Sequence, residues 1–363
     1  MSAKQQFYDT FSQPARASGR AWGRVNLIGE HLDYNGGLVL PAPIARFIEV
    51  AIGPKDSDVD EIHSNIFGDS VCRPLEFKVQ GDWSDYVAAT LALSRKLGFL
   101  SGAVNVSINS DIPQGAGVSS SAALIVASLR AVLELNENAQ DQSYDLTPDL
   151  TMIARWAQSV ENDYIGVPCG IMDQIAVSAS ELGQAIALDT ESLEYSIVDL
   201  PKDYHFAVVF SGVTRQLDEG RYAIRRQECE AAAAQLNVPL LCKMSESQSQ
   251  EINTLPDVLA RRARHVVSEH DRVLEAVDKL SRKNIVRFGE LMDLSHESMR
   301  DDFEITVPEI DKLVQNSRDF GALGARMTGG GFGGCIVACV ANLELDDWSQ
   351  QVLAAHPAAT IIA

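Results

Sequence analysis

The chain has 363 residues, 46% hydrophobic and 22% charged, so it is neither disordered nor fibrous and is long enough for two domains. Its 30 Lys and Arg against 50 Asp and Glu give a net charge of −20, which argues against sequence-independent binding to nucleic acid or anionic lipid. The N-terminus lacks the apolar core of a signal peptide, and the longest apolar runs are too short to span a bilayer. We therefore expect a soluble, cytoplasmic protein with no membrane or nucleic-acid partner.

The first half of the chain alternates β-type and helical patterns. Residues 20–53 combine β-rich runs with turn residues and predict two or three short strands. Apolar periodicity then predicts, in chain order, a helix at 83–96, a strand at 103–112, and helices at 122–135, 148–163 and 171–179.

The pattern changes after residue 180. Strands are predicted at 185–190, 194–200 and 205–212, and long polar helices at 218–236, 258–281 and 283–300. We therefore predict an N-terminal domain at 1–185 and a C-terminal domain at 186–363. The polar stretch 243–253 predicts a surface loop, and the basic cluster 261–265 predicts a helix face with salt bridges.

Residues 23–35, GRVNLIGEHLDYN, concentrate ionisable side chains directly after a strand. Packing alone does not require Arg24, Glu30, His31 and Asp33 together, whereas a polar ligand such as an array of sugar hydroxyls would use them as donors and acceptors. The alternative is a solvated loop with an internal Arg–Asp ion pair.

A Gly/Ser-rich loop, PQGAGVSSSA at 113–122, leads into a strongly apolar helix. Small residues let the backbone approach a phosphate closely, and the helix points its positive end at the same place. The serine hydroxyls suit phosphate oxygens or a Mg²⁺ ion. No lysine follows as in G-x-x-x-x-G-K-[ST], and the alternative is a flexible loop with a serine N-cap.

A third glycine cluster, TGGGFGGC at 328–335, runs into the β-type sequence CIVACV. Gly329, Gly331 and Gly334 fit G-x-G-x-x-G, but a dinucleotide site needs a helix after the glycines and an acid about twenty residues later. We expect instead a backbone that packs against another loop or a ligand, with a hairpin bend in the core as the alternative.

Two acidic residues stand out between these segments. Asp173 lies among apolar neighbours, where a carboxylate is costly unless it is paired or functional, and Arg24 is a candidate partner. Glu161 on the preceding predicted helix could bind a cation or could simply face solvent.

In order and spacing these segments resemble the galactokinases, a branch of the GHMP small-molecule kinases. The resemblance covers roughly residues 17–345 and includes GRVNLIGEHxDYN, PxGAGxSSSA, VPCGIMDQ and ARMTGGGFGGC. It implies an α+β, two-domain GHMP kinase fold, with an N-terminal domain like ribosomal protein S5 domain 2, a ferredoxin-like C-terminal domain, and an active site in the cleft between them. The implied reaction is phosphorylation of the C1 hydroxyl of galactose by ATP with Mg²⁺, the first committed step of galactose catabolism. We expect a monomer.

The resemblance also implies roles for residues. Asp173 matches the catalytic aspartate, either as a base or as an electrostatic orienter, and Arg24 matches the arginine that holds it ionised and steadies the phosphoryl group. The matched sugar contacts are Glu30, His31, Asp33, Gly170 and Tyr222. The matched phosphate loop comprises Gly115, Ala116, Gly117, Ser119, Ser120 and Ser121, and Trp83 and Tyr86 are expected near the nucleotide base. Ser121 and Glu161 match the Mg²⁺ ligands, and Gly330 and Gly331 match the motif that supports the active-site loops.

Two departures from the galactokinase pattern leave the acceptor sugar open. Trp22 replaces a proline before the first motif, and Leu32 replaces a threonine, which resembles the N-acetylgalactosamine kinases. The alternatives are a kinase of a related sugar such as N-acetylgalactosamine or arabinose, or a non-catalytic galactose sensor. Known sensors of this lineage lack the Ser-Ala pair that ends the phosphate loop, so its presence here as Ser121-Ala122 favours catalysis.

Overall fold

The computed structural model describes residues 2–113, 115, 117–138, 148–167, 169–213 and 219–363. The chain forms two compact units, each built from several segments. The first unit comprises Met1–Arg24, Ile44–Ile112 and Ser119–Ala179, and the second comprises Val25–Pro43, Pro113–Val118 and Ser180–Ala363. The domain boundary near residue 185 stays a prediction, and in this division the segment carrying Glu30 and His31 belongs with the C-terminal half.

A five-stranded sheet forms the centre of the first unit. In sheet order its strands are β1 (Ala17–Asn26), β3 (Pro41–Lys55), β6 (Ala103–Ser110), β4 (Val59–Ser64) and β5 (Ser70–Pro74). β6 pairs antiparallel with β3 and parallel with β4, and β4 pairs antiparallel with β5. The strands predicted within 20–53 and at 103–112 are thus confirmed, whereas β4 and β5 were not predicted.

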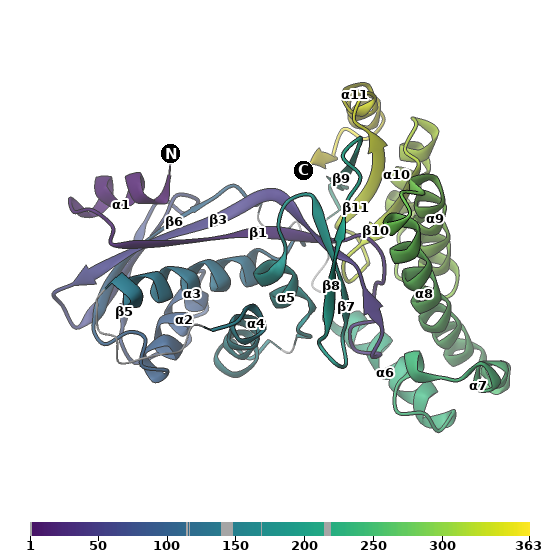
Figure 1. Ribbon diagram of the computed structural model, residues 1–363, viewed down its shortest axis with the longest axis horizontal. Helices are drawn as coiled ribbons and strands as arrows, with labels where there is room; N and C mark the ends of the chain where they lie inside the picture. The colour runs from purple at the N-terminus through teal and green to yellow at the C-terminus, as the bar shows by residue number, and fades with distance from the viewer. Residues whose placement is uncertain (1, 114, 116, 139–147, 168, 214–218) are drawn as a thin grey trace. The chain divides into compact units, whose positions relative to one another are not determined.

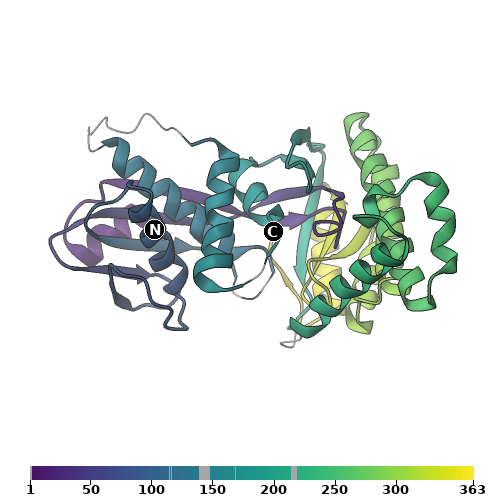
Figure 2. The same cartoon turned by 90° about the horizontal axis from the view of Figure 1, so that it is seen from below.

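Helices cover both faces of this sheet. They are α1 (Ala3–Phe11), α2 (Asp85–Lys96), α3 (Ser120–Asn138), α4 (Leu150–Ser159), the π-helical turn η1 (Val160–Ile165) and α5 (Met172–Ala179). Figure 1 shows α1 on one face and α2 to α5 on the other, and in Figure 2 the latter group lies in front of the strands. α3 buries Ala123, Val126 and Ala127, the i, i+3, i+4 pattern that predicted it.

The second unit contains two sheets. One has the order β10 (Gly324–Thr328), β11 (Cys335–Ala341), β9 (Tyr204–Phe210) and β12 (Thr360–Ile361), and the other has the order β2 (Leu38–Val39), β7 (Gln184–Asp189) and β8 (Tyr195–Asp199). β11 is almost wholly buried, as its continuous apolar run suggests for a central strand. The three strands predicted after residue 180 are confirmed.

The helices of the second unit are α6 (Glu219–Gln235), α7 (Glu246–Ser249), α8 (Asp257–Ser281), α9 (Ile285–Asp301), α10 (Pro308–Asp319) and α11 (Leu345–Ala355). α8 and α9 pack on each other, and α9 and α10 pack on β10 (Figure 1). The loop predicted at 243–253 is wrong in its conformation: short helical turns occupy Leu241–Thr254, and a capping box at Ser245 starts α7. No helix within the described ranges combines the length and apolarity needed to cross a membrane.

Candidate active site

Arg24 and Asp173 form a bidentate ion pair within the first unit. Arg24 Nε donates to Asp173 Oδ1 at 2.8 Å, and Arg24 Nη2 donates to Oδ2 at 2.6 Å. β1 carries the arginine, and the first turn of α5 carries the aspartate. The arginine side chain is 9% exposed and the aspartate side chain 32%, so the carboxylate is the part of the pair that a ligand can reach. The predicted partnership of these two residues is confirmed.

Ser119 is a third member of this group. Its Oγ donates to Asp173 Oδ2 at 2.6 Å. Its φ of 60° lies in the left-handed region, which non-glycine residues adopt rarely and often at functional turns. The sequence suggested a phosphate ligand for this hydroxyl, whereas the structure bonds it to the predicted catalytic carboxylate.

Glu161 in η1 is a buried carboxylate with polar side chains around it. It accepts hydrogen bonds from the Gln174 amide and, at 3.7 Å, from the Cys169 thiol. Burial raises the pKa of Glu161 and the negative charge of Asp173 adds to the rise, while the neighbouring Ser121 hydroxyl, Gln174 amide and Cys169 thiol lower it. Burial also raises the pKa of the Cys169 thiol to about 12, so this group stays protonated and is no nucleophile.

The donor set at Glu161 suits a magnesium ion. Mg²⁺ binds hard oxygen ligands, commonly one or two carboxylates together with substrate phosphates. The Ser121 hydroxyl lies near enough to Glu161 to lower the pKa of that carboxyl, so the predicted pair offers a hydroxyl and a carboxylate close to each other. The residues present therefore fit the ion.

The phosphate loop has the backbone conformation that its glycines allow. Gly115 and Gly117 have φ values of 71° and 73°. Ser120 is the first residue of α3 and is exposed, so the N–H groups of this helix end are near solvent. Ala116, also predicted to contact phosphate, lies outside the described residues.

Trp83 lies in the turn before α2. Its ring stacks on Phe67, with centroids 4.9 Å apart and an interplanar angle of 8°. A buried arginine, Arg73, fixes this turn by donating to Ser84 and Asp85. Tyr86, the other residue expected near the base, lies close enough to Glu161 for that carboxylate to add to the rise in its pKa, which burial mainly causes.

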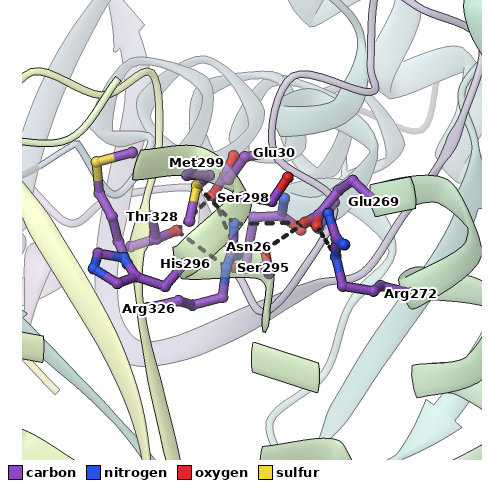
Figure 3. Close-up of polar contacts among 12 residues, drawn as sticks. Asn26, Glu30, Glu269, Arg272, Ser295, His296, Ser298, Met299, Arg326 and Thr328 are labelled. Atoms are coloured by element: carbon purple, nitrogen blue, oxygen red, sulfur yellow. Dashed lines mark hydrogen bonds and ion pairs between the residues drawn. The ribbon is translucent and has the colours of Figure 1, made fainter. Parts of the chain in front are cut away.

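Glu30 is anchored in the second unit through one oxygen. Its Oε1 accepts hydrogen bonds from the Thr328 hydroxyl at 2.9 Å and the Gly329 N–H at 2.7 Å, and it lies 3.6 Å from Arg326 Nη1 (Figure 3). In the described part of the chain the hydrogen bonds and the ion pair of the Glu30 side chain all involve this oxygen. Oε2 is therefore the oxygen that can accept from a ligand hydroxyl.

Aromatic rings surround His31. Its Nδ1 is 2.8 Å from the Tyr34 hydroxyl, and its ring lies 5.1 Å from Tyr222 on α6 and 4.9 Å from Phe303. Burial raises the pKa of Tyr34, and the nearby Tyr222 and Asp33 add to this rise. The structure thus gathers His31, Asp33 and Tyr222, three of the predicted sugar contacts.

The third glycine cluster is the turn of a hairpin. β10 pairs antiparallel with β11, with Thr328 opposite Cys335, so no helix follows the glycines and the dinucleotide interpretation is rightly excluded. Gly331 has a φ of 90°, and a Cβ there would lie 2.7 Å from the Ile305 carbonyl oxygen. Both expectations hold: the segment is a hairpin bend, and its backbone packs closely against another loop.

Comparison with known proteins places the chain in a family. Residues 85–181 match the GHMP kinases N terminal domain, residues 274–347 match the GHMP kinases C terminal domain, and residues 5–54 match the galactokinase galactose-binding signature. A galactokinase of Actinobacillus pleuropneumoniae serotype 3 (strain JL03) is 37% identical over 355 residues, 95% of this chain and 90% of that protein. The chain belongs to the galactokinase family.

Solved structures agree with this membership. The structure of Lactococcus lactis galactokinase complexed with galactose superposes with a TM-score of 0.84 at 30% identity, covering 99% of this chain and 95% of that one. Methanococcus jannaschii mevalonate kinase shares the fold, with a TM-score of 0.68 at 18% identity over 96% of this chain and 97% of that one. The predicted α+β fold with GHMP kinase N-terminal and C-terminal domains is confirmed.

The two departures from the galactokinase family pattern have different surroundings. Leu32 is fully buried, and its Cβ faces Gly37. Trp22 is half-buried and packs edge-on against Phe47, with centroids 6.1 Å apart. Gly170, the remaining predicted sugar contact, is exposed just before α5.

Sequence reasoning missed several residues that hold the predicted site. Arg326 and Thr328 bond the segment that carries Glu30, and Gln174 bonds Glu161. A charged residue inside the otherwise apolar β10 was the available signal for Arg326, which is fully buried.

The basic cluster at 261–265 lies on α8 and forms salt bridges with nearby acids, as predicted. Arg261 and Arg264 form ion pairs near the surface with Glu304 and Asp302. Arg262 and His265, however, are buried.

Proposed function

We propose that this galactokinase-family chain transfers the γ-phosphoryl group of ATP to the anomeric hydroxyl of galactose, giving galactose 1-phosphate. The observation that carries the proposal is the bidentate Arg24–Asp173 pair with the Ser119 hydroxyl on the same carboxylate. Phosphoryl transfer requires mainly the positioning of a nucleophile and the neutralisation of charge, and this group offers an acceptor for the hydroxyl proton beside a fixed cation.

Asp173 is the proposed acceptor for the anomeric hydroxyl. Its two oxygens take three hydrogen bonds, which fix the carboxylate plane and leave the exposed edge for the sugar. As a hydrogen-bond acceptor it orients the hydroxyl and, in the base mechanism, takes its proton. Arg24 adds a positive charge beside the transferring group, where negative charge is spread over the phosphoryl oxygens.

Magnesium is the proposed cofactor, held by Ser121 and Glu161. When bound it neutralises charge on the ATP phosphates. Glu161 is buried and hydrogen-bonded by Gln174, so its orientation is set before substrate arrives. Gly115, Gly117 and the N-terminal end of α3 are the proposed backbone contacts to phosphate, and Trp83 is the proposed neighbour of the base.

Galactose recognition is proposed to use Glu30, His31, Asp33, Gly170 and Tyr222. Charged and aromatic groups in this combination suit a sugar, which presents hydroxyls on one edge and C–H groups on a face. Glu30 contributes Oε2, since Oε1 is committed to Thr328 and Gly329. The monomeric state and cytoplasmic location stay predictions.

A coupled ADP-release assay with Mg·ATP and a sugar panel tests the proposal. The panel contains galactose, N-acetylgalactosamine, glucose, arabinose and galacturonate, and we expect turnover with galactose. Asp173→Asn should abolish turnover while galactose still binds in calorimetry. Glu61→Gln, which removes the charge from a partly exposed Lys55–Glu61 pair, is the matched control and should keep full activity.

Each other outcome has a defined meaning. Turnover of a different sugar would keep the mechanism and assign the specificity to the surroundings of Trp22 and Leu32. Saturable galactose binding with no turnover of any sugar would favour the sensor. Persistent phosphorylation by Asp173→Asn would overturn the role of this carboxylate.

A further inference from the structure

One face of α8 contacts the segment that carries Glu30 and His31. Glu269 Oε1 accepts the Gly29 N–H at 2.9 Å, and His265 Nε2 lies 3.5 Å from the Glu30 carbonyl oxygen. Residues 265, 269 and 273 are four apart, so they lie on one helix face. Val273, the third of them, packs against Gly29.

The fit between α8 and this segment is close. Gly29 has a φ of 104°, and a Cβ there would lie 3.1 Å from the Val273 side chain and 3.0 Å from the Leu38 carbonyl oxygen. His31 also has a left-handed φ, 63°. A positive φ at a non-glycine residue such as His31 persists where the surroundings fix it, and Glu269 supplies a buried acceptor two residues earlier, at the Gly29 N–H.

Glu269 is a fully buried and fully bonded carboxylate. Oε1 also accepts from the Ser295 hydroxyl at 2.6 Å, and Oε2 accepts from Arg272 Nε at 2.7 Å. Although burial opposes ionisation, the two neighbouring arginines Arg272 and Arg326 lower the pKa of Glu269 to about 2. The group is therefore a fixed anion at every physiological pH, and proton transfer is not its role.

Arg326 links Glu269 to Glu30. It is fully buried, with Nη1 3.6 Å from Glu30 Oε1, Nη2 3.9 Å from Glu269 Oε1, and a hydrogen bond to the Asn26 carbonyl at 3.2 Å (Figure 3). The two carboxylates share this cation. With the charge of Glu269 removed, Arg326 would attract Glu30 alone, and the sugar would compete with Arg326 for that carboxylate.

We propose that Glu269 is a positioning residue for sugar binding, acting through the Gly29 N–H and through Arg326 to set the place and charge of Glu30. It does not touch substrate. The inference rests on the proposed function, because it assumes that Glu30 binds the acceptor sugar.

The test compares Glu269→Gln with Asp60→Asn in the full-length chain. Asp60 is a matched control in the first unit: its side chain is 1% exposed and accepts from one arginine, Arg95, and one backbone N–H, that of Val104. Glu269→Gln should raise the KM and the calorimetric Kd for galactose by about tenfold or more, with the KM for ATP changed less than twofold. Asp60→Asn should change stability without changing galactose affinity.

A purely structural role would give a different pattern. It would lower the melting temperature and the active fraction of Glu269→Gln while leaving the galactose KM of the folded molecules unchanged, and that result would overturn the inference. If Glu269→Gln does not fold, Ser295→Ala is judged by the same criterion. It removes one donor to Glu269 and should raise the galactose KM about threefold.

Failure of the proposed function is recognised separately. It would appear as a wild-type chain inactive with every sugar, and the galactose Kd of the wild type and of Glu269→Gln would still test the positioning role. Equal affinities would overturn it, and a tenfold loss would support it.

Discussion

Ser119 gives a sharp prediction because sequence and structure assign its hydroxyl to different partners. The family resemblance places it on a phosphate of ATP, whereas the structure has it donating to Asp173 Oδ2 at 2.6 Å. Ser119→Ala removes the hydroxyl and leaves the Arg24 pair in place. The two assignments then differ in which kinetic constant changes.

The magnitude follows from the kind of bond lost. A hydrogen bond to a charged group contributes about 1.5–3 kcal/mol, and each 1.4 kcal/mol corresponds to about tenfold in rate. If the bond holds Asp173 in its reactive orientation, Ser119→Ala should lower kcat about 10- to 100-fold. The KM for ATP should change less than twofold, because no contact to the nucleotide is lost.

The assay is steady-state ADP release over a matrix of ATP and galactose concentrations. Ser120→Ala serves as the comparison, since Ser120 is exposed at the start of α3 and has its predicted role on phosphate only. Ser119→Gly should lower kcat like Ser119→Ala but unfold at a higher temperature, because glycine accepts the φ of 60° without strain worth about 1 kcal/mol. A raised KM for ATP with unchanged kcat in Ser119→Ala would refute the reasoning and return Ser119 to the phosphate.

Three further predictions concern the cation, acid stability and the glycine hairpin. Glu161→Gln should raise the free Mg²⁺ concentration needed for half-maximal activity by about tenfold, measured at fixed ATP, and an unchanged requirement would remove Glu161 from the ion. Burial lowers the pKa of His265 from its ordinary 6.5 to about 4, so the unfolded chain binds the proton more readily than the folded chain. The contribution of neutral His265 to the free energy of unfolding is therefore present above pH 6.5 and is lost as the pH falls toward 4. The wild type should therefore lose about 2 kcal/mol more unfolding free energy than His265→Gln between pH 7 and pH 5 in denaturant titrations, and parallel losses would contradict this. Gly331→Ala should cost about 2 kcal/mol or more, because its Cβ would collide with Ile305 at a φ of 90°, whereas Gly115→Ala has nothing within 4 Å and should cost about 1 kcal/mol in the same titration.

The elements predicted from sequence are those with a strong apolar period or a continuous apolar run. α3 and β11 are examples, and their observed bounds differ from the predicted ones by a few residues at most. β4 and β5 were missed because their sequences, VDEIHS and SVCRP, mix charged and apolar residues without a clear signal. Helical turns replace the predicted loop at 243–253 because Ser and Gln satisfy their ends locally, which a polar composition alone does not reveal.

Two of the three residues around Asp173 in the first unit could be predicted from the sequence. A lone carboxylate among apolar residues indicated Asp173, and the need for a counter-charge indicated Arg24. The third member was assigned differently because the direction of the Ser119 hydroxyl depends on its backbone φ, and neighbouring residues do not determine that angle.

The residues of the second unit that hold Glu30 were harder to predict from the sequence, for a reason that applies to buried charge in general. The α8 face that meets residues 29–30 contains His265, Glu269 and Val273, and this mixture has no apolar stripe, so the pattern favours a solvent-facing helix. A carboxylate can be buried only when donors surround it, and the donors to Glu269 come from Gly29, Arg272 and Ser295, the first of them 240 positions away. The charge of Glu269 is balanced by Arg272 in the next turn of α8 and by Arg326 on β10, so the sequence pattern shows only part of what allows its burial. In the proposed role, Glu269 sets the geometry of a ligand-binding segment without touching the ligand. Measuring the galactose affinity of Glu269→Gln is therefore more informative about the second-unit residues than measuring it for another substitution of a proposed sugar contact.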